Sequence, residues 1–377
     1  MDDIIREIGR RRQRGERMAL ASLVWSSGSI PMSDRAKMIV GEDGGIFGTI
    51  GGGCLEAEVL TAGRTALETG DNQLMRYTMT EKQAGESGLN CGGTVRIYTE
   101  LIAPNSSSDL YGAVLEARAA RQGCILATLL KGRNDLGVGK LWIGADGATR
   151  GSLGAAAVDR QVAERLPAVL KRERGQVFEL DLDRATVDLL GEVSGEFAGK
   201  PEVFIEPFLP EPVLYVFGGG HVGGHIGVLA KNVGFRVVII DDRPAFANPE
   251  RHPGVDECLV AEMDGVFDQL PIDNQAYIVI ATRGHQHDEI VVEAAIKTPA
   301  RYVGMIGSER KKMMLWRRIE SRGGDREQLG RVYAPIGANI GADTPEEIAI
   351  SVVAELISIR RGKYKVWKTK KGGVDGR

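Results

Sequence analysis

The sequence predicts a two-domain α/β protein, with an N-terminal domain of two duplicated α/β units and a C-terminal parallel sheet. Apolar runs of strand length alternate with segments of helical spacing along the chain. The pattern of residues 14–104 begins again over residues 121–210, as in an internal repeat. A proline-rich stretch at 207–212 separates the two halves, so we expect domains at 1–210 and 211–377.

The first repeat opens with a helix and continues as a sheet. Residues 1–16 place three isoleucines on one face of an amphipathic helix. The apolar runs that follow have strand length, and the sequence Glu-Asp-Gly-Gly joins two of them as a hairpin turn. Strands are expected at 18–25, 37–40, 45–50, 74–79 and 94–101. The triplet Gly51, Gly52 and Gly53 opens a helix that runs to about Glu68.

The second repeat keeps the scaffold of the first but changes its glycine triplet. Residues 139–162 align without a gap with residues 36–59, which pairs Lys140 with Lys37. Where the first copy reads GGGCLE, the second reads GAAAVD. Close packing of the helix on a strand would explain the glycines but not the cysteine. We therefore expect any chemistry of this domain to lie on the first copy, with Gly51, Gly52 and Gly53 as candidate cofactor-binding residues.

The second domain begins with a strand, a glycine turn, a helix, a second strand and an acid. The apolar run 213–217 is followed at once by GGGHVG, which fits G-x-G-x-x-G. A segment of helical spacing leads to the apolar run 235–240, which ends in Asp241 and Asp242. This order, with an acid about 20 residues past the turn, is typical of a Rossmann-like parallel sheet. Further strands are expected at 258–262, 277–282 and 301–307, and helices at 288–297, 309–321 and 345–360.

The last of these helices carries a complete start signal. Thr344 stands before Pro345, and Glu347 follows at the third helical position. This pattern predicts a capping box, with proline at a position where its missing N–H has no helical partner. The basic residues beyond position 360 are expected to form a solvated tail.

Each residue of the glycine turn has an expected task. Gly218 permits a tight turn, Gly220 lets a phosphate approach the backbone, and Gly223 lets the helix pack closely on the strand. The helix N-terminus adds free N–H groups and a partial positive charge. His221 is unusual here, because it places an imidazole where a phosphate or another ligand head group would lie. The alternative is a glycine turn that binds nothing.

Chemistry-bearing residues cluster where the strands are expected to end. In an open parallel sheet, ligands lie beyond the carboxyl ends of the strands. The candidate cofactor-binding residues at these ends are Asp242, Arg243, Arg283, His285, His287, Asp288 and Ser308. Ser308 opens a helix with three cations behind it, which favours an anion. The sequence TRGHQHD permits a metal site, contact with an anion or cofactor, or a structural role in which Asp288 caps the next helix.

Two of the four cysteines are candidate reactive thiols. Cys54 follows the glycine triplet at a helix start, a position that favours a reactive thiolate. Cys91 heads the sequence Cys-Gly-Gly at the end of a polar loop. Cys124 and Cys258 have the setting of small core residues. There is no CxxC pair, so we do not expect a structural zinc site, and no residue is assigned as a metal ligand.

The composition is that of an ordinary globular protein. The chain has 377 residues and a net charge of −3, which indicates two or three domains and no nucleic-acid footprint. No apolar run reaches the roughly 18 residues that a membrane-spanning helix needs. The charged N-terminus lacks the apolar core of a signal peptide. We therefore expect a cytoplasmic protein without a membrane partner.

The chain resembles the xanthine dehydrogenase accessory factor family (XdhC/CoxI type) over nearly its full length. The matching segments are GTIGGGCLEAEV, CGGTVRIYTE, VFGGGHVG, VVIIDDRPAFAN, TRGHQHD, YVGMIGSERKK and PIGANIGADTPEEIAISVVAELISIRRG. The resemblance implies a maturation factor for a molybdenum hydroxylase that binds molybdenum cofactor (molybdopterin), assists its sulfuration, protects it and inserts it. The implied partners are the apo-enzyme, a cysteine desulfurase and a second copy of the chain in a homodimer.

Under this resemblance, the glycine turn suits the phosphate of molybdopterin, and Cys54 or Cys91 suits its molybdenum or sulfur end. The protein would then be a non-catalytic cofactor chaperone rather than an enzyme. The alternatives are an NAD(P)-dependent oxidoreductase that uses Asp241 or Asp242, and a partner-binding scaffold. A xanthine dehydrogenase itself is not expected, because two [2Fe–2S] clusters need more cysteine ligands than the four cysteines of this chain.

Overall fold

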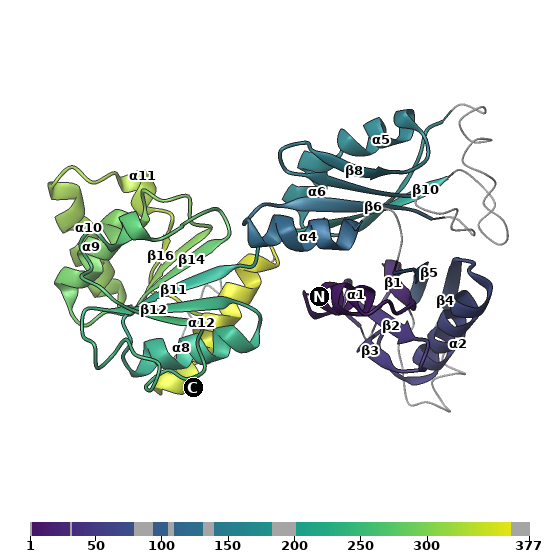
Figure 1. Cartoon of the computed structure of the whole chain (residues 1–377). Helices are drawn as coiled ribbons and strands as arrows, with labels where there is room; N and C mark the ends of the chain where they lie inside the picture. The colour runs from purple at the N-terminus through teal and green to yellow at the C-terminus, as the bar shows by residue number, and fades with distance from the viewer. Residues whose placement is uncertain are drawn as a thin grey trace, which may run out of the picture. The chain divides into compact units, whose positions relative to one another are not determined.

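The computed structural model describes residues 2–30, 32–78, 93–104, 109–130, 139–182 and 201–362. It divides into two compact units, Met1–Pro210 and Glu211–Arg377 (Figure 1). Both units combine helices and sheets, so the α/β class is confirmed. Among the residues described, none of the helices has the length and apolarity that crossing a membrane requires.

The described part of the first unit contains two antiparallel sheets with equivalent strand orders, β3-β2-β1-β5-β4 and β8-β7-β6-β10-β9. The first sheet consists of β1 (Met18–Ser27), β2 (Lys37–Gly41), β3 (Ile46–Thr49), β4 (Gln73–Thr78) and β5 (Thr94–Ile102). The second consists of β6 (Cys124–Leu130), β7 (Lys140–Gly144), β8 (Thr149–Ser152), β9 (Gln176–Glu179) and β10 (Glu202–Phe208). A duplication would produce this common order, and the duplication itself stays a prediction.

Helices cover the sheets and join them through a shared core. They are α1 (Asp2–Gln13), α2 (Gly53–Thr69), α4 (Leu110–Ala119), α5 (Ala156–Ala163) and α6 (Leu166–Arg172). The apolar face predicted for the first helix is confirmed, because Ile5 and Ile8 of α1 are fully buried. Helices α1 and α4 pack together, and their apolar side chains form one cluster with Leu20 of the first sheet and Leu126 of the second.

Buried ion pairs also tie the two sheets together. The Nζ atom of Lys37 in β2 lies 2.9 Å from a carboxylate oxygen of Glu206 in β10. In the corresponding position of the other sheet, Lys140 in β7 lies 2.9 Å from Glu100 in β5. Each lysine also donates a hydrogen bond to a hydroxyl of the neighbouring strand in its own sheet. Because a buried charge is tolerated only when it is paired and hydrogen-bonded, these contacts restrict how the sheets can meet.

The second unit is built on a six-stranded sheet with the order β13-β12-β11-β14-β15-β16, in which every pairing is parallel. Its strands are β11 (Val213–Phe217), β12 (Arg236–Asp241), β13 (Glu257–Val260), β14 (Ala276–Ile280), β15 (Tyr302–Met305) and β16 (Val332–Tyr333). This is the strand order of doubly wound dinucleotide-binding folds, so the predicted Rossmann-like sheet is confirmed.

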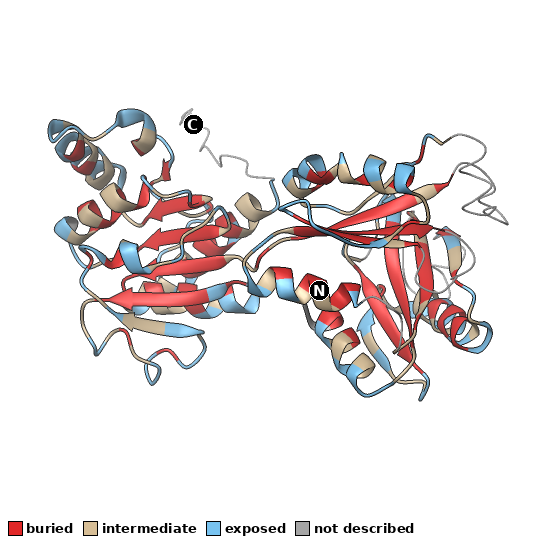
Figure 2. Cartoon of the chain, turned by 45° about the horizontal axis from the view of Figure 1, so that its top comes forward, coloured by how far each residue is buried: buried red, intermediate tan, exposed pale blue. Residues whose placement is uncertain are grey.

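Helices cover both faces of this sheet. They are α8 (His221–Asn232), α9 (His285–Ala295), α10 (Glu309–Ser321), α11 (Arg326–Leu329) and α12 (Pro345–Arg360). Successive side chains of a strand point to opposite faces. Val213, Tyr215 and Phe217 of β11 therefore join a core with α9 and α10, whereas Leu214 and Val216 join a core with α8 and α12. The central strands are consequently buried along their length (Figure 2).

Two predicted helix starts have different outcomes. The capping box of α12 is confirmed. The Thr344 side chain accepts a hydrogen bond from the Glu347 N–H, and the Glu347 side chain accepts one from the Thr344 N–H. The prediction that Asp288 could cap a helix is wrong. Helix α9 begins three residues earlier, at His285, with Gly284 as its N-cap. The side chain of Asp288 instead pairs with Lys311 of α10.

Candidate functional site

The glycine turn lies at the point where the strand order of the second sheet reverses. The Gly218 N–H donates a hydrogen bond of 2.7 Å to the carbonyl of Ile240, near the end of β12. On the other side, the Ala281 N–H that follows β14 donates one of 2.8 Å to the carbonyl of Phe217. The turn therefore rises from β11 between the carboxyl ends of its two neighbours, where ligands of open α/β sheets bind.

Close backbone contacts explain three of the glycines, and open space distinguishes the fourth. Gly218 has φ 114°, a backbone conformation that favours glycine. A Cβ atom on Gly219 would overlap the carbonyl oxygen of Phe246, and one on Gly223 would overlap that of Gly218. By contrast, no atom lies within 4 Å of the position that a Cβ atom of Gly220 would occupy. The space beside the Gly220 α-carbon is therefore open, and the approach of a ligand at this residue stays a prediction.

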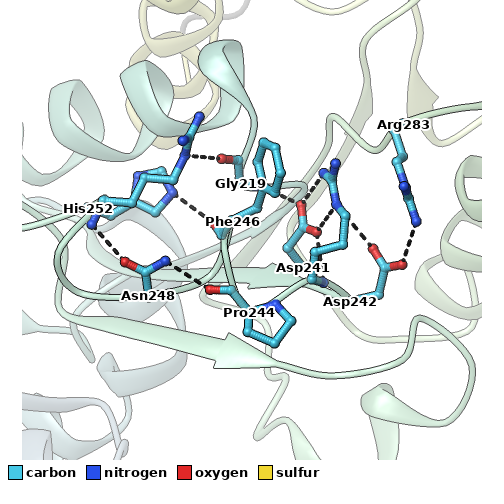
Figure 3. A network of polar contacts seen from close by, with 10 residues as sticks. Gly219, Asp241, Asp242, Pro244, Phe246, Asn248, His252 and Arg283 are labelled. Atoms are coloured by element: carbon cyan, nitrogen blue, oxygen red, sulfur yellow. Dashed lines mark hydrogen bonds and ion pairs between the residues drawn. The ribbon is translucent and has the colours of Figure 1, made fainter.

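The acid at the end of β12 is already occupied. The side chain of Asp241 is only 2% exposed. Its carboxylate accepts hydrogen bonds from the Gly219 N–H (2.9 Å) and from the backbone N–H, Nε and Nη2 of Arg243 (3.1, 2.8 and 3.0 Å; Figure 3). In a nucleotide site this acid must present its oxygens to a ribose hydroxyl. Asp241 instead holds the glycine turn and orients an arginine.

We expect Asp241→Asn to destabilise the second unit by about 2–3 kcal/mol at pH 7, because it breaks a buried ion pair and weakens the support of the turn. Burial raises the pKa of Asp241. Hydrogen bonds from Arg243 and from the Gly219 N–H lower this pKa by more than burial raises it, so the net pKa lies below its ordinary value. Such a group stabilises the fold above the unfolded-state pKa, and this contribution is lost as the pH falls through the folded-state pKa.

Urea unfolding followed by circular dichroism from pH 7 to pH 3 would measure this effect. The difference between wild type and Asp241→Asn should shrink below about pH 4. The exposed Glu262→Gln provides a control for loss of a carboxylate. A difference that stays constant with pH would show that the ionised carboxylate contributes nothing.

An aromatic ring and two arginines surround the outer side of the turn. The Cζ atoms of Arg243 and Arg251 lie 3.6 and 4.6 Å from the ring centroid of Phe246. Arg251 Nε also donates to the carbonyl of Gly219 (3.3 Å), and His252 Nε2 lies 2.9 Å from the carbonyl oxygen of Phe246. Cation–π contacts hold the guanidinium groups in place and leave the turn beside positive charge.

Phe246, Arg251 and His252 lie beside the glycine turn, although no motif of the sequence predicts them there. The available signal is the run RPAFANPERH, which brings two arginines and an aromatic residue directly after the strand-end acid. That this run folds back onto the glycine turn follows from tertiary contacts only.

Asp242, the second acid at this strand end, pairs with Arg283. Asp242 follows β12, and Arg283 comes from the segment after β14. Arg283 Nη2 donates to Asp242 Oδ2 at 3.0 Å (Figure 3). Asp242 also lies 3.8 Å from the Nε atom of Arg243. The structure therefore brings together three of the predicted site residues beside the glycine turn.

Asp288 lies apart from the charged residues beside the glycine turn. It is fully buried, and Lys311 Nζ lies 2.5 Å from its Oδ2 atom while Thr282 Oγ1 donates to Oδ1 at 2.7 Å. The contact joins α9 to α10. These contacts give Asp288 a structural role other than helix capping, because its oxygens contact Lys311 and Thr282.

The other predicted strand-end residues are more open. His221 is exposed as the first residue of α8, and Ser308 is the N-cap of α10, accepting from the Lys311 N–H. His287 is half-buried, and His285 opens α9 with a side chain that lies outside the described residues. Within the described ranges, no group of three or more His, Cys, Asp and Glu side chains could hold a metal ion.

In the first unit, the glycine triplet opens α2 as an irregular loop. Gly51, Gly52 and Gly53 have φ angles of 115°, 78° and 67°. Cys54 follows in the first turn of α2, exposed and with a free thiol. Cys91 lies outside the described residues. Three successive residues thus have positive φ angles, a conformation that favours glycine, and the exposed thiol of Cys54 follows them directly.

Two family models match this chain. Residues 214–356 match the XdhC Rossmann domain, and residues 11–78 match the XdhC and CoxI family. A crystal structure described as a xanthine dehydrogenase from Bacillus halodurans shares the fold. Its TM-score is 0.72 at 21% identity, and the match covers 97% of this chain and 98% of that chain.

Three curated proteins are also similar. A protein of Bacillus subtilis (strain 168), described as a probable subunit of xanthine dehydrogenase, is 25% identical over 353 residues, which cover 92% of this chain and 94% of the relative. In Escherichia coli (strain K12), the uncharacterised protein YqeB is 32% identical over 222 residues, or 59% of this chain, and the molybdenum cofactor insertion chaperone PaoD is 27% identical over 101 residues, or 25%. The matches span only 40% of YqeB and 32% of PaoD. On the strength of both family models and of the full-length relative, this chain belongs to the XdhC and CoxI family.

Proposed function

We propose that the chain is an accessory factor in the maturation of a molybdenum hydroxylase of the xanthine dehydrogenase type. Its family and its likeness to a molybdenum cofactor insertion chaperone support this role. Within it, the chain would bind molybdenum cofactor, assist its sulfuration, protect it and insert it into the apo-enzyme. A cysteine desulfurase and a second copy of the chain are proposed partners.

The observation that carries this proposal is the chemistry of the glycine turn. Gly220 is open to a ligand, and Arg243 and Arg251 lie beside the turn. Molybdopterin carries a phosphate, which backbone N–H groups at a helix start and arginines bind well. The two acids that could recognise a ribose, Asp241 and Asp242, are instead paired with Arg243 and Arg283. The site therefore suits a phosphate better than it suits the adenosine ribose of NAD.

Within the first unit, Cys54 is a separate candidate contact for the cofactor. Its thiol is exposed and free, and soft sulfur ligands suit molybdenum with its dithiolene and sulfido groups. We therefore propose Cys54 as a contact of the molybdenum or sulfur end, together with Cys91. The cofactor itself would supply the chemistry of the target enzyme, while this chain would hold and transfer it.

Titration of the purified chain with molybdenum cofactor and with NAD(H) tests the role. We expect saturable binding of molybdenum cofactor and activation of apo-hydroxylase, with no rise in melting temperature on addition of NAD(H). Stabilisation by NAD(H) without binding of molybdenum cofactor would favour the NAD(P)-dependent oxidoreductase instead.

Replacement of Cys54 by serine should weaken retention of molybdenum cofactor by about tenfold, as loss of a metal-site contact commonly does. The half-exposed Cys258, on β13 of the other unit, provides a matched control that should retain wild-type affinity. Molybdenum bound per chain after gel filtration gives the measurement. Equal retention by the Cys54→Ser and Cys258→Ser variants would remove Cys54 from the site.

A further inference from the structure

The ion pair between Asp242 and Arg283 spans the strand from which the glycine turn rises. Asp242 follows β12 and Arg283 follows β14, and these two strands flank β11 in the sheet. The Nη2–Oδ2 distance is 3.0 Å. The pair thus crosses the switch point of the sheet, which is where ligands of this fold class bind.

The Asp242–Arg283 ion pair can separate at little cost in stability. The side chain of Arg283 is 57% exposed, whereas that of Asp242 is 14% exposed. An ion pair with one solvated partner contributes little net stability, because water screens it and both side chains lose freedom. The nearby Asp241–Arg243 pair is different, since Asp241 is buried and accepts hydrogen bonds from both Arg243 and Gly219. The first pair can therefore exchange partners while the second keeps the turn in shape.

We propose that the carboxylate of Asp242 takes the place of a ligand phosphate in the unliganded chain. It pairs with Arg283 until a phosphate displaces the carboxylate from the guanidinium. This inference rests on the proposed function, since it concerns how the same site admits a phosphorylated ligand. A carboxylate and a phosphate make the same charge-assisted hydrogen bonds to a guanidinium, and a phosphate offers more oxygens and more charge. Arg283 then becomes a ligand contact, and Asp242 sets how strongly an anion must compete to enter.

Two consequences distinguish this exchange from a simple change in charge. Removal of the Asp242 charge should strengthen anion binding, because Arg283 is then free in advance. That gain should depend on Arg283, since Asp242 acts through it. If Asp242 only repelled anions, its removal would help whether or not Arg283 were present.

The test uses inorganic pyrophosphate as the probe, titrated calorimetrically into the full chain. We expect Asp242→Asn to tighten binding by about three- to tenfold, and Arg283→Gln to weaken it by about tenfold. In the double variant, the gain from Asp242→Asn should disappear. The control is Glu257→Gln, which removes the acid of an exposed pair with Arg236 (3.1 Å), formed by the first residues of β12 and β13 at the opposite edge of the sheet.

The outcomes separate this inference from the proposed function. If wild type binds pyrophosphate and Asp242→Asn binds it no better than Glu257→Gln does, the exchange is overturned and the phosphate site stands. A gain from Asp242→Asn that persists without Arg283 also overturns the exchange, in favour of charge repulsion. If neither wild type nor Asp242→Asn binds, both the exchange and the phosphate site are overturned.

Discussion

Replacing Lys37 by methionine should destabilise the N-terminal unit by about 3–5 kcal/mol, because it leaves the carboxylate of Glu206 buried without its partner. The side chains of Lys37 and Glu206 are only 5% and 9% exposed, so water cannot take the place of the missing ammonium group. The hydrogen bond from Lys37 to Ser22 is lost as well. Amide hydrogen exchange of β2 and β10 would report the change as faster opening of these strands.

The matched control for this loss is the double variant in which Glu206 also becomes leucine. Removing both partners of a buried ion pair is often neutral, because the desolvation of both charges is no longer required. The Lys37→Met/Glu206→Leu variant should therefore recover most of the lost protection. Lys140→Met should cost less than Lys37→Met, since its side chain is 20% exposed. If Lys37→Met and the double variant open equally fast, the buried charge is not the cause.

Alanine at Gly219 should cost about 3 kcal/mol in the C-terminal unit and abolish phosphate binding. The new Cβ atom would overlap the carbonyl oxygen of Phe246, and its two nearest neighbours are backbone atoms of Phe246 that cannot rotate away. Moving that segment would also displace the Phe246 ring from Arg243 and Arg251. Thermal unfolding and calorimetric titration with pyrophosphate would measure the two effects.

Alanine at Gly220 separates binding from folding. This residue has φ −69°, and no atom lies within 4 Å of the added Cβ position. Gly220→Ala should therefore stay within about 0.5 kcal/mol of wild-type stability, yet lose phosphate affinity, because the methyl group occupies the approach to the backbone. Wild-type affinity in Gly220→Ala would mean that the phosphate does not approach at this residue.

The glycine turn shows how much of the site can be predicted from sequence. The tasks of Gly218 and Gly223 follow from the motif, and the structure bears them out in a positive φ angle and in a helix packed against the turn. The capping box at Thr344 is equally local, since its partners lie within one helical turn. Such features depend on sterics and hydrogen bonds between residues close in sequence, so a single chain segment reveals them.

The ion-pair partners of the charged residues cannot be predicted in this way. Asp241 and Asp242 are both plausible nucleotide ligands by position, but each is paired with an arginine in the folded chain. Asp288 has the place of a helix cap and instead lies buried against Lys311 of the next helix. Pattern and spacing do not report which of several cations reaches a carboxylate, because that depends on the packing of separate helices and loops.

From its sequence, this protein can therefore be described as an α/β chain with a glycine turn, a strand-end acid and a family resemblance. The folded structure adds how far each charge is buried and which partner it has: Asp241 is buried against Arg243, Arg283 is largely exposed beside Asp242, and Lys37 is paired with a glutamate of the other sheet. The physical reason is that glycine geometry and helix capping act over a few residues. The energy of a charge instead depends on its burial and on partners far along the chain, which only the tertiary structure brings together.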